Sequence, residues 1–233
     1  MKIALLGYGK MGKIIEQMAV SRGHEIVIKA NKNTSYNISL ADVAIDFSVP
    51  DAAVSNISTC LENNVPVVCG TTGWLDHYKE MVSLCKAKNG AFLYASNFSL
   101  GVNILFELNR QLAKLMSGIK SYQVQIEEIH HTEKLDKPSG TAITLANTII
   151  ENHTGYNTWK LDAKGENSIP VYAKRIKDVP GTHTLKYSSP IDTLTLTHEA
   201  HSREGFALGA VLAAEWLLDK KGVFSMKDVL NIG

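Results

Sequence analysis

The first 95 residues alternate short apolar runs, rich in β-branched residues, with segments whose apolar positions recur at helical spacing. The five apolar runs expected to form strands are Lys2 to Leu6, His24 to Ala30, Val43 to Phe47, Val65 to Cys69 and Ala91 to Tyr94. Helices are expected after the first run, ending at Gly23, from a cap at Asp51 to about Asn63, and from Trp74 to Lys88. The polar segment from Asn31 to Asp42 is too short for a full helix and predicts a simple connection. This alternation is typical of a parallel sheet covered by helices.

The pattern changes after a long apolar helix expected at about 101–116. Period-two alternation predicts longer strands at 122–129, 171–175, 183–187 and 192–200, with one helix from the PSGTA sequence to about Asn152. The segment 152–169 is rich in Asn, Gly, Lys and Thr and is expected to be an exposed loop. The last helix, about 206–219, is apolar on most faces and is expected to be buried. Strands of this length and spacing predict a mostly antiparallel or mixed sheet.

A glycine-rich turn follows the first strand and opens the first helix. Its residues are Gly7, Tyr8, Gly9, Lys10, Met11 and Gly12, which match the pattern GxGxxG in the strand–turn–helix context that the motif requires. Glycines allow a tight turn and let a pyrophosphate approach backbone N–H groups at the helix N-terminus. The motif therefore predicts a dinucleotide site, although a glycine turn that only eases packing would give the same letters.

The end of the second strand carries no carboxylate. NAD-binding folds usually place an acidic residue about 20 residues after the glycine turn to hold the ribose hydroxyls. This chain instead reads Lys29, Ala30, Asn31, Lys32. The two lysines could attract the 2′-phosphate of NADPH; alternatively, they belong to a solvated loop.

Three further strand ends offer small or polar residues to the same carboxyl edge of the sheet, where doubly wound folds bind ligands. The candidates for contact with the cofactor are Phe47, Ser48, Gly70, Thr71, Thr72, Ala95, Ser96, Asn97 and Phe98. Any one of these turns alone is typical of an ordinary loop that binds no ligand. Together they predict a lined crevice and an α/β chain with an N-terminal Rossmann-like doubly wound parallel sheet and a second α+β domain. Residues 1–98 with about 205–233 would form the dinucleotide-binding domain, and 99–204 the substrate-binding and oligomerisation domain.

The densest polar segment, Glu128 to Ala142, leaves a strand and enters a helix through Pro-Ser-Gly-Thr. Ser139 and Thr141 are good N-terminal capping types, and free N–H groups there form an anion site. The side chains of His130, His131 and Lys134 near this terminus suit a small substrate that bears carboxylates, and both residue types can donate protons. The alternative is a metal site, but adjacent histidines on an extended chain point to opposite sides and the spacing matches no standard zinc pattern. No metal is expected, and His183, His198 and His201 are assigned no role.

Composition narrows the class of protein. The 233 residues include 24 Lys and Arg against 23 Asp and Glu, so a broad surface for nucleic acid is not expected. No apolar run approaches the ~20 residues of a membrane-spanning helix. Three cysteines without CxxC spacing argue against a disulfide framework or zinc ribbon. The short apolar start runs into the glycine turn and does not match a secretory signal. These features predict a soluble, cytoplasmic protein without nucleic-acid or membrane partners.

Taken together, GYGKMG, IDFSVP, GTTG, ASNFSLGVN, EIHHTEKLDKPSGTA and SREGFALGA resemble the dihydrodipicolinate reductase family of lysine and diaminopimelate biosynthesis, over nearly the whole chain. The resemblance implies reduction of a cyclic unsaturated dicarboxylate with NADH or NADPH by a homotetramer. It implies that His130 is the catalytic histidine, that Lys134 is the proton donor, and that His131, Gly140 and Thr141 bind substrate together with Lys134 and Ser139. Lys10 stands where the family often has arginine.

Two other classes stay open at this stage. One is a different two-domain nicotinamide-dependent reductase, such as an aspartate-type dehydrogenase, and the pairing of HHxxK with PSGT speaks against it. The other is a non-catalytic regulator that senses dinucleotides. A sensor has no need for imidazoles and a lysine beside a helix terminus.

Overall fold

The structure, a computed structural model, describes residues 1–232. The chain divides into two compact units, one made of Met1–Leu100 with Arg203–Gly233 and the other of Gly101–Ser202. The first unit is therefore discontinuous in sequence, since the chain leaves it for the second unit and returns for its last segment. The sequence-based expectation had boundaries at 98 and about 205. Each unit is described separately below.

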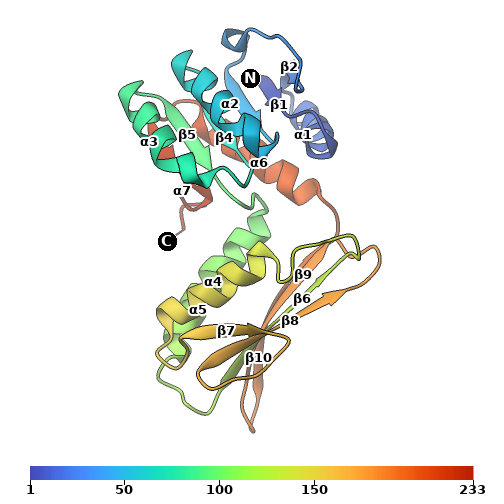
Figure 1. Ribbon diagram of the computed structural model, residues 1–233, viewed down its shortest axis with the longest axis vertical. Helices are drawn as coiled ribbons and strands as arrows, with labels where there is room; N and C mark the ends of the chain where they lie inside the picture. The colour runs from blue at the N-terminus through green and yellow to red at the C-terminus, as the bar shows by residue number, and fades with distance from the viewer. Residues whose placement is uncertain (233) are drawn as a thin grey trace. The chain divides into compact units, whose positions relative to one another are not determined.

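The first unit, whose strands β1, β2, β4 and β5 are labelled in Figure 1, contains a six-stranded sheet in the order β11-β5-β4-β3-β1-β2. Every neighbouring pair in this sheet is parallel. Its strands are β1 (Lys2–Leu6), β2 (Glu25–Ala30), β3 (Val43–Asp46), β4 (Val67–Cys69), β5 (Ala91–Tyr94) and β11 (Gly222–Phe224). The five strands expected from the sequence are present. The sixth, β11, is missing from the sequence-based prediction because three residues are too few to show a period.

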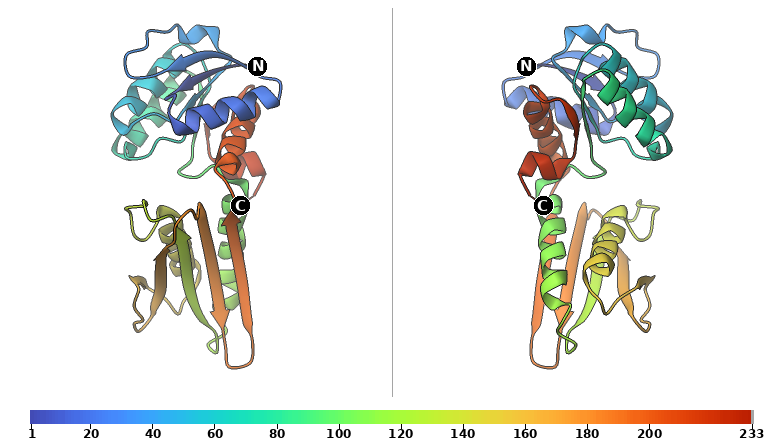
Figure 2. Two further views of the ribbon diagram at one scale, coloured as in Figure 1. Left: turned by 90° about the vertical axis from the view of Figure 1, so that its right-hand side faces the viewer. Right: turned by 90° about the vertical axis from the view of Figure 1, so that its left-hand side faces the viewer.

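Helices cover both faces of this sheet, as the turned views show (Figure 2). They are α1 (Lys10–Ser21), α2 (Pro50–Glu62), α3 (Tyr78–Ala87), α6 (Glu204–Leu217) and α7 (Met226–Leu230), with the 3-10 turns η1 (Ile38–Leu40) and η2 (Leu75–His77). Apolar side chains of α2 and α3 pack on one face, and those of α1 and α6 on the other. The doubly wound arrangement is thereby confirmed.

Two details of these helices differ from the expectation. The residue before α2 is Val49, and Pro50 occupies the first turn, so Asp51 is not the cap. Proline is favoured there because its fixed φ suits a helix and its missing N–H would have no partner. The helix expected from Trp74 begins as the 3-10 turn η2 and becomes α-helical only at Tyr78.

The second unit combines two helices with a five-stranded mixed sheet in the order β10-β9-β6-β8-β7. The elements are α4 (Leu100–Met116), β6 (Gln123–His130), α5 (Gly140–Asn152), β7 (Thr158–Leu161), β8 (Ser168–Arg175), β9 (Gly181–Ser188) and β10 (Thr193–Ala200). β6 pairs antiparallel with β9 and parallel with β8. The segment 152–169 is not simply a loop, because it contains β7; only four residues long and half exposed, this edge strand shows little of a strand's pattern.

One face of this mixed sheet carries the core of the unit. Val124 and Ile126 of β6 point toward it and are buried against Leu105 of α4 and Leu145 of α5. Residues between them, such as Gln125, point to the other face, which is polar and threonine-rich. The period-two pattern thus places apolar side chains under the helices. In the described residues no helix has both the length and the apolar character needed to cross a lipid bilayer.

Candidate cofactor and substrate sites

The carboxyl ends of the central strands of the first unit lie in register. Leu6 pairs with both Ala30 and Asp46, Asp46 pairs with Cys69, and Cys69 pairs with Tyr94. The segments that follow these residues therefore leave the sheet at the same edge. This brings together the glycine turn and the turns that begin at Asn31, Phe47, Gly70 and Ala95, as the sequence predicts.

The glycine turn is built by the backbone. Gly7 has φ +95°, and a Cβ atom there would lie 2.2 Å from the carbonyl oxygen of Phe47. A Cβ on Gly12 would lie 2.5 Å from the carbonyl oxygen of Gly7. The N–H groups of Gly7 and Tyr8 both donate to the carbonyl of Ala30, at 2.9 and 3.2 Å. Only glycine fits at positions 7 and 12, and strand β2 fixes the turn from the side.

The same turn leaves open space above the start of α1. Gly9 is the residue before the helix, it is exposed, and a Cβ atom added to it would meet no protein atom within 4 Å. An exposed helix N-terminus with free N–H groups suits a pyrophosphate, both by hydrogen bonding and by the helix dipole. The geometry of these residues fits a dinucleotide.

Three of the predicted cofactor residues pack against one another. A Cβ on Gly70 would lie 2.3 Å from the ring of Phe47, and the rings of Phe47 and Phe98 have centroids 5.5 Å apart. The carbonyl of Phe98 lies so close to α6 that a Cβ on Gly209 would be 1.7 Å from it. Glycine at 70 and 209 thus lets the aromatic residues of two strand ends pack together at the edge of the sheet.

Thr71 turns its hydroxyl into the protein. Its Oγ1 donates to Asp46 at 2.6 Å and accepts from the N–H of Ser48 at 2.8 Å, and Asn56 donates to the same aspartate. Burial raises the pKa of Asp46, and these donors only partly oppose the effect. The hydroxyl of Thr71 therefore ties two strand ends together, which the sequence pattern did not indicate.

The two lysines near the end of β2 differ. Lys29 forms an ion pair with Glu16 of α1 at 2.6 Å, and its ammonium lies 5.3 Å from the ring centroid of Tyr8, whose hydroxyl also bonds Glu16. The structure gives Lys32, which is exposed, no ion pair or hydrogen bond to another described side chain. Asn31 accepts from the N–H of Tyr8 through its side chain at 3.1 Å. Of the two cations, Lys32 is the one available for an added phosphate.

In the second unit, the predicted catalytic segment connects the end of β6 to the start of α5. His130 is the last residue of β6 and is buried, whereas His131 is half-buried outside the strand. The ammonium of Lys134 contacts both carboxylate oxygens of Asp136, at 2.7 and 2.8 Å. Burial alone would raise the pKa of Asp136, but this ammonium outweighs it and lowers the pKa.

The start of α5 is capped as the sequence predicts. The Oγ of Ser139 accepts from the N–H of Ala142 at 3.2 Å. Gly140 is exposed, and a Cβ atom there would meet no atom within 4 Å. Thr141 lies half-buried in the first turn. The space beside Gly140 is open to a small anion at the positive end of the helix.

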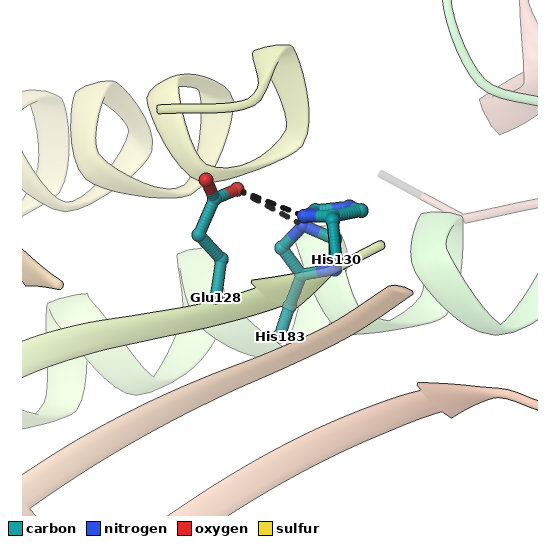
Figure 3. Close-up of side chains that lie close together, drawn as sticks. All are labelled: Glu128, His130 and His183. Carbon is teal, nitrogen blue, oxygen red and sulfur yellow. Dashed lines mark ion pairs between the residues drawn. The ribbon is translucent and has the colours of Figure 1, made fainter. Parts of the chain in front are cut away.

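A buried cluster lies behind these groups, made of Glu128, His130 and His183 (Figure 3). Glu128 is 0% exposed and lies 3.5 Å from Nδ1 of His130 and 3.8 Å from Nε2 of His183. The two rings meet edge to face, with centroids 5.0 Å apart. His183 also bonds the hydroxyl of Ser139 at 3.1 Å. The cluster thus joins β6, β9 and the start of α5.

Both imidazoles of this cluster favour the neutral form. Burial lowers the pKa of His183 to about 3, and the neighbouring His130, His198 and Lys134 add to the effect. Burial also lowers the pKa of His130; the cations Lys134 and Arg175 lower it further, and Glu128 opposes them. The surroundings of His130 therefore favour its neutral imidazole.

The three side chains of the cluster offer atoms within 4.8 Å of one another, which is close enough for a metal ion. The carboxylate already has strong partners, because Arg175 donates to it at 3.2 Å and the N–H of Ser139 donates to both its oxygens. A guanidinium beside a carboxylate takes the place that a cation would fill. The chemistry of this cluster is that of an ion-pair and hydrogen-bond network.

Sequence reasoning missed Glu128, Arg175 and His183 as members of the site. Pairing within the sheet brings them together, since His130 lies opposite Arg175 and Glu128 lies opposite His183. The available signal was an ionisable residue at a position of period-two alternation that should be apolar, as at Glu128 and His183. Such a residue needs a buried partner, but one sequence does not reveal which.

A doubly wound parallel sheet whose glycine turn fits a dinucleotide, in a chain whose second unit has a mixed sheet and an open helix terminus that suits a small anion, is typical of two-domain nicotinamide-dependent reductases. The comparison with family models gives the particular family. Residues 1–98 match the model for the N-terminus of dihydrodipicolinate reductase, and residues 101–230 match the model for its C-terminus. The chain belongs to the dihydrodipicolinate reductase family, and the resemblance drawn from its motifs is confirmed.

Individual relatives agree. The chain is 57% identical to the 4-hydroxy-tetrahydrodipicolinate reductase of Christiangramia forsetii, over 99% of this chain and 98% of the relative. It is 34% identical to the protein of the same name from Thermosipho africanus, with the same coverage. A solved structure, the dipicolinate-bound dihydrodipicolinate reductase from Paenisporosarcina sp. TG-14, has a TM-score of 0.77 at 24% identity and covers 96% of this chain and 97% of its own, which supports the fold.

Proposed function

We propose that this protein reduces 4-hydroxy-tetrahydrodipicolinate to tetrahydrodipicolinate with NADH or NADPH, in lysine and diaminopimelate biosynthesis. The observation that carries the proposal is the family match over both units, together with a relative of that activity at 57% identity. An aspartate-type dehydrogenase is disfavoured by the same matches. A non-catalytic sensor is disfavoured by the cluster of imidazoles and lysine beside α5.

The first unit would hold the cofactor. The N–H groups at the start of α1 would bind the pyrophosphate over Gly9, and Lys32 would bind the 2′-phosphate of NADPH. The turns at Phe47–Ser48, Gly70–Thr72 and Ala95–Phe98 would line the rest of the crevice through their backbone and aromatic groups. When bound, reduced nicotinamide supplies a hydride.

The second unit would hold the substrate and supply the proton. The N–H groups of Gly140 and Thr141 at the start of α5, with Ser139 and His131, would bind one carboxylate. An ammonium group has three donors, and Asp136 accepts from two of them, so Lys134 has a donor left for a second carboxylate or for the proton transfer. The 4-hydroxyl group leaves as water, which gives the unsaturated dicarboxylate that accepts the hydride. Lys134 would then donate the proton to the electron-rich carbon, and His130 would orient that transfer.

The activity is tested directly by generating the unstable substrate with the synthase that precedes this step and following the loss of reduced nicotinamide absorbance. Loss of absorbance that depends on synthase, its substrates and this protein supports the proposal. Gly140→Val is a matched variant, since its side chain would enter open space and leave the fold intact while it blocks the helix terminus. It should raise KM with cofactor affinity unchanged. No turnover with either cofactor would refute the proposal.

We also propose that the protein is a cytoplasmic homotetramer that assembles through the second unit. Its α4 helix exposes an apolar stripe, with Ile104 47%, Leu108 46% and Leu115 74% exposed, at spacings that share one side of a helix. β10 is an edge strand whose Leu194 is 42% exposed. Leu108→Lys should weaken assembly, as measured by mass in solution. A fully active wild-type monomer at working concentration would contradict the tetramer.

A further inference from the structure

An ion pair joins the fully buried Glu128 of β6 to the partly buried Arg175 of β8, with a closest approach of 3.2 Å. We propose that Glu128 and Arg175 act as one positioning unit that holds His130 and Lys134 in the geometry for proton transfer. The proposal rests on the proposed function, which gives the proton transfer to those two residues. Neither Glu128 nor Arg175 is itself assigned contact with the reacting atoms.

Arg175 holds the loop that carries the lysine. Its Nε donates to the carbonyl oxygen of Lys134 at 3.2 Å, and its NH2 group donates to the carbonyl oxygen of Asp136 at 2.6 Å. Asp136 is also the residue whose carboxylate binds the ammonium of Lys134. The guanidinium therefore fixes the backbone at both ends of the three-residue turn and, through Asp136, the position of the ammonium.

Glu128 connects that clamp to the rest of the site. Its carboxylate accepts from the N–H of Ser139 at 3.1 and 3.0 Å, and it lies 3.5 Å from Nδ1 of His130. One fully buried carboxylate thus touches the guanidinium, the imidazole and the residue that caps α5. A movement of the guanidinium would move the proton donor, the imidazole and the anion-binding helix terminus together.

A second ion pair on the same two strands provides a comparison for the pair of Glu128 and Arg175. Glu127 and Lys174 are 2.5 Å apart, but they point to the opposite, polar face of the sheet, and their side chains are 32% and 53% exposed. In the described structure their side chains have no hydrogen bond or ion pair to the residues from His130 to Gly140. Lys174 with Glu127 is therefore a matched control for chemistry, sequence position and strand pairing.

The opposite charges of Glu128 and Arg175 predict opposite shifts in the pKa of His130 when each is removed. The groups that face its imidazole are Glu128 on its own strand, Lys134 and Asp136 in the loop, Arg175 of β8 and His183 of β9, behind which lies His198 of β10. Removing the carboxylate should lower the pKa of His130, and removing the guanidinium should raise it. A general loosening of the fold would expose the ring and raise the pKa in both cases, because burial is what lowers it most.

The experiment uses the intact protein with Arg175→Lys, Arg175→Gln, Glu128→Gln, the double variant Glu128→Gln/Arg175→Gln and the control double variant Glu127→Gln/Lys174→Gln. Four quantities are measured for each: kcat, KM, cofactor affinity and thermal unfolding. The pKa of His130 is measured by NMR, with its signals assigned by their loss in His130→Asn. The double variant is decisive, because removing both charges avoids the unpaired charge that a single substitution leaves.

The expected result is a loss of at least tenfold in kcat in the double variant, with thermal unfolding close to wild type and unchanged cofactor affinity. Arg175→Lys keeps the charge but cannot donate to both carbonyls and the carboxylate in one fork, so it should fold normally and also lose kcat. The control double variant should keep wild-type kcat. A double variant that regains kcat within about twofold of wild type along with its stability would show that the pair is structural only, as would pKa shifts of one sign.

Failure of the proposed function gives a different pattern. If Lys134→Ala and His130→Asn both retain full kcat, the assignment of proton transfer to these two residues is refuted, and the positioning role of Glu128 and Arg175 is refuted with it. If those two variants lose activity while the double variant at 128 and 175 does not, only the positioning role is refuted.

Discussion

The proposed cofactor site of the first unit and the proposed substrate site of the second differ in the groups that form them. The first is a backbone site, in which Gly7 and Gly12 leave no room for a Cβ atom and strand ends bring the turns together. The second depends on side chains, because the groups around His130 come from three strands and a helix cap and are held by Glu128 and Arg175. The arrangement of the first site depends on steric fit, and that of the second depends on charges and protonation states. The two should therefore respond to different perturbations.

The largest effect is expected from Lys134→Ala in the second unit. If Lys134 gives the proton in the transition state, the change should lower kcat by a factor on the order of 10² to 10⁴. Cofactor affinity, measured by fluorescence or calorimetry, should stay at the wild-type value because the glycine turn is untouched. Lys137→Ala is the control, since Lys137 is exposed and pairs with Asp162. Near wild-type kcat in Lys134→Ala, or a joint loss of folding and cofactor binding, would show that the segment is structural.

The difference between the sites also explains how much the sequence predicts. The glycine turn is local, so the pattern GxGxxG identifies it directly, and the alternation of β1 to β5 with helices predicts these strands and their parallel arrangement. His130, Lys134 and Ser139 are likewise read from one continuous segment. Arg175 and His183 lie 45 and 53 residues beyond His130, and only the pairing of β6 with β8 and β9 brings them into contact with Glu128. The local sequence predicts candidate catalytic groups, but it does not predict the distant residues that contact them.

Acid should weaken the protein through the second unit. Burial lowers the pKa of His183 to about 3, so the folded protein resists a proton that the unfolded chain accepts below pH ~6.5. The contribution of neutral His183 to the free energy of unfolding is therefore fully present above about pH 6.5. It is lost as the pH falls toward 3, at up to about 1.4 kcal/mol per pH unit. In His183→Gln, the unfolding free energy measured with denaturant should fall by roughly 2 kcal/mol less between pH 7 and 5 than it does in the wild type. Parallel curves for the two proteins would mean that His183 accepts its proton in the folded state.

The glycine turn should instead be sensitive to added side-chain volume. Gly12→Ala places a methyl group 2.5 Å from the carbonyl of Gly7 and should cost about 1–3 kcal/mol of unfolding free energy, as overpacking does. Gly9→Ala enters open space and should cost less than about 1 kcal/mol, the scale of a changed helix cap. It should still weaken cofactor binding, because the methyl group occupies the approach to the helix terminus. Equal stability losses in the two variants would undercut the description of this site as a backbone cradle.

The smallest effect is expected on the choice between NADPH and NADH, which should depend on a charged side chain of the first unit. We expect NADPH to be used at least as well as NADH, since β2 ends without a carboxylate and Lys32 is exposed. Lys32→Ala should lower the NADPH-to-NADH ratio of kcat/KM by roughly five- to tenfold, the loss of about one charge-assisted hydrogen bond. Lys29→Ala should change the ratio less, because its ammonium is already bound to Glu16 at 2.6 Å. A clear preference for NADH, or a ratio that neither substitution alters, would remove the phosphate-binding role from both lysines and leave cofactor choice to the shape of the turn.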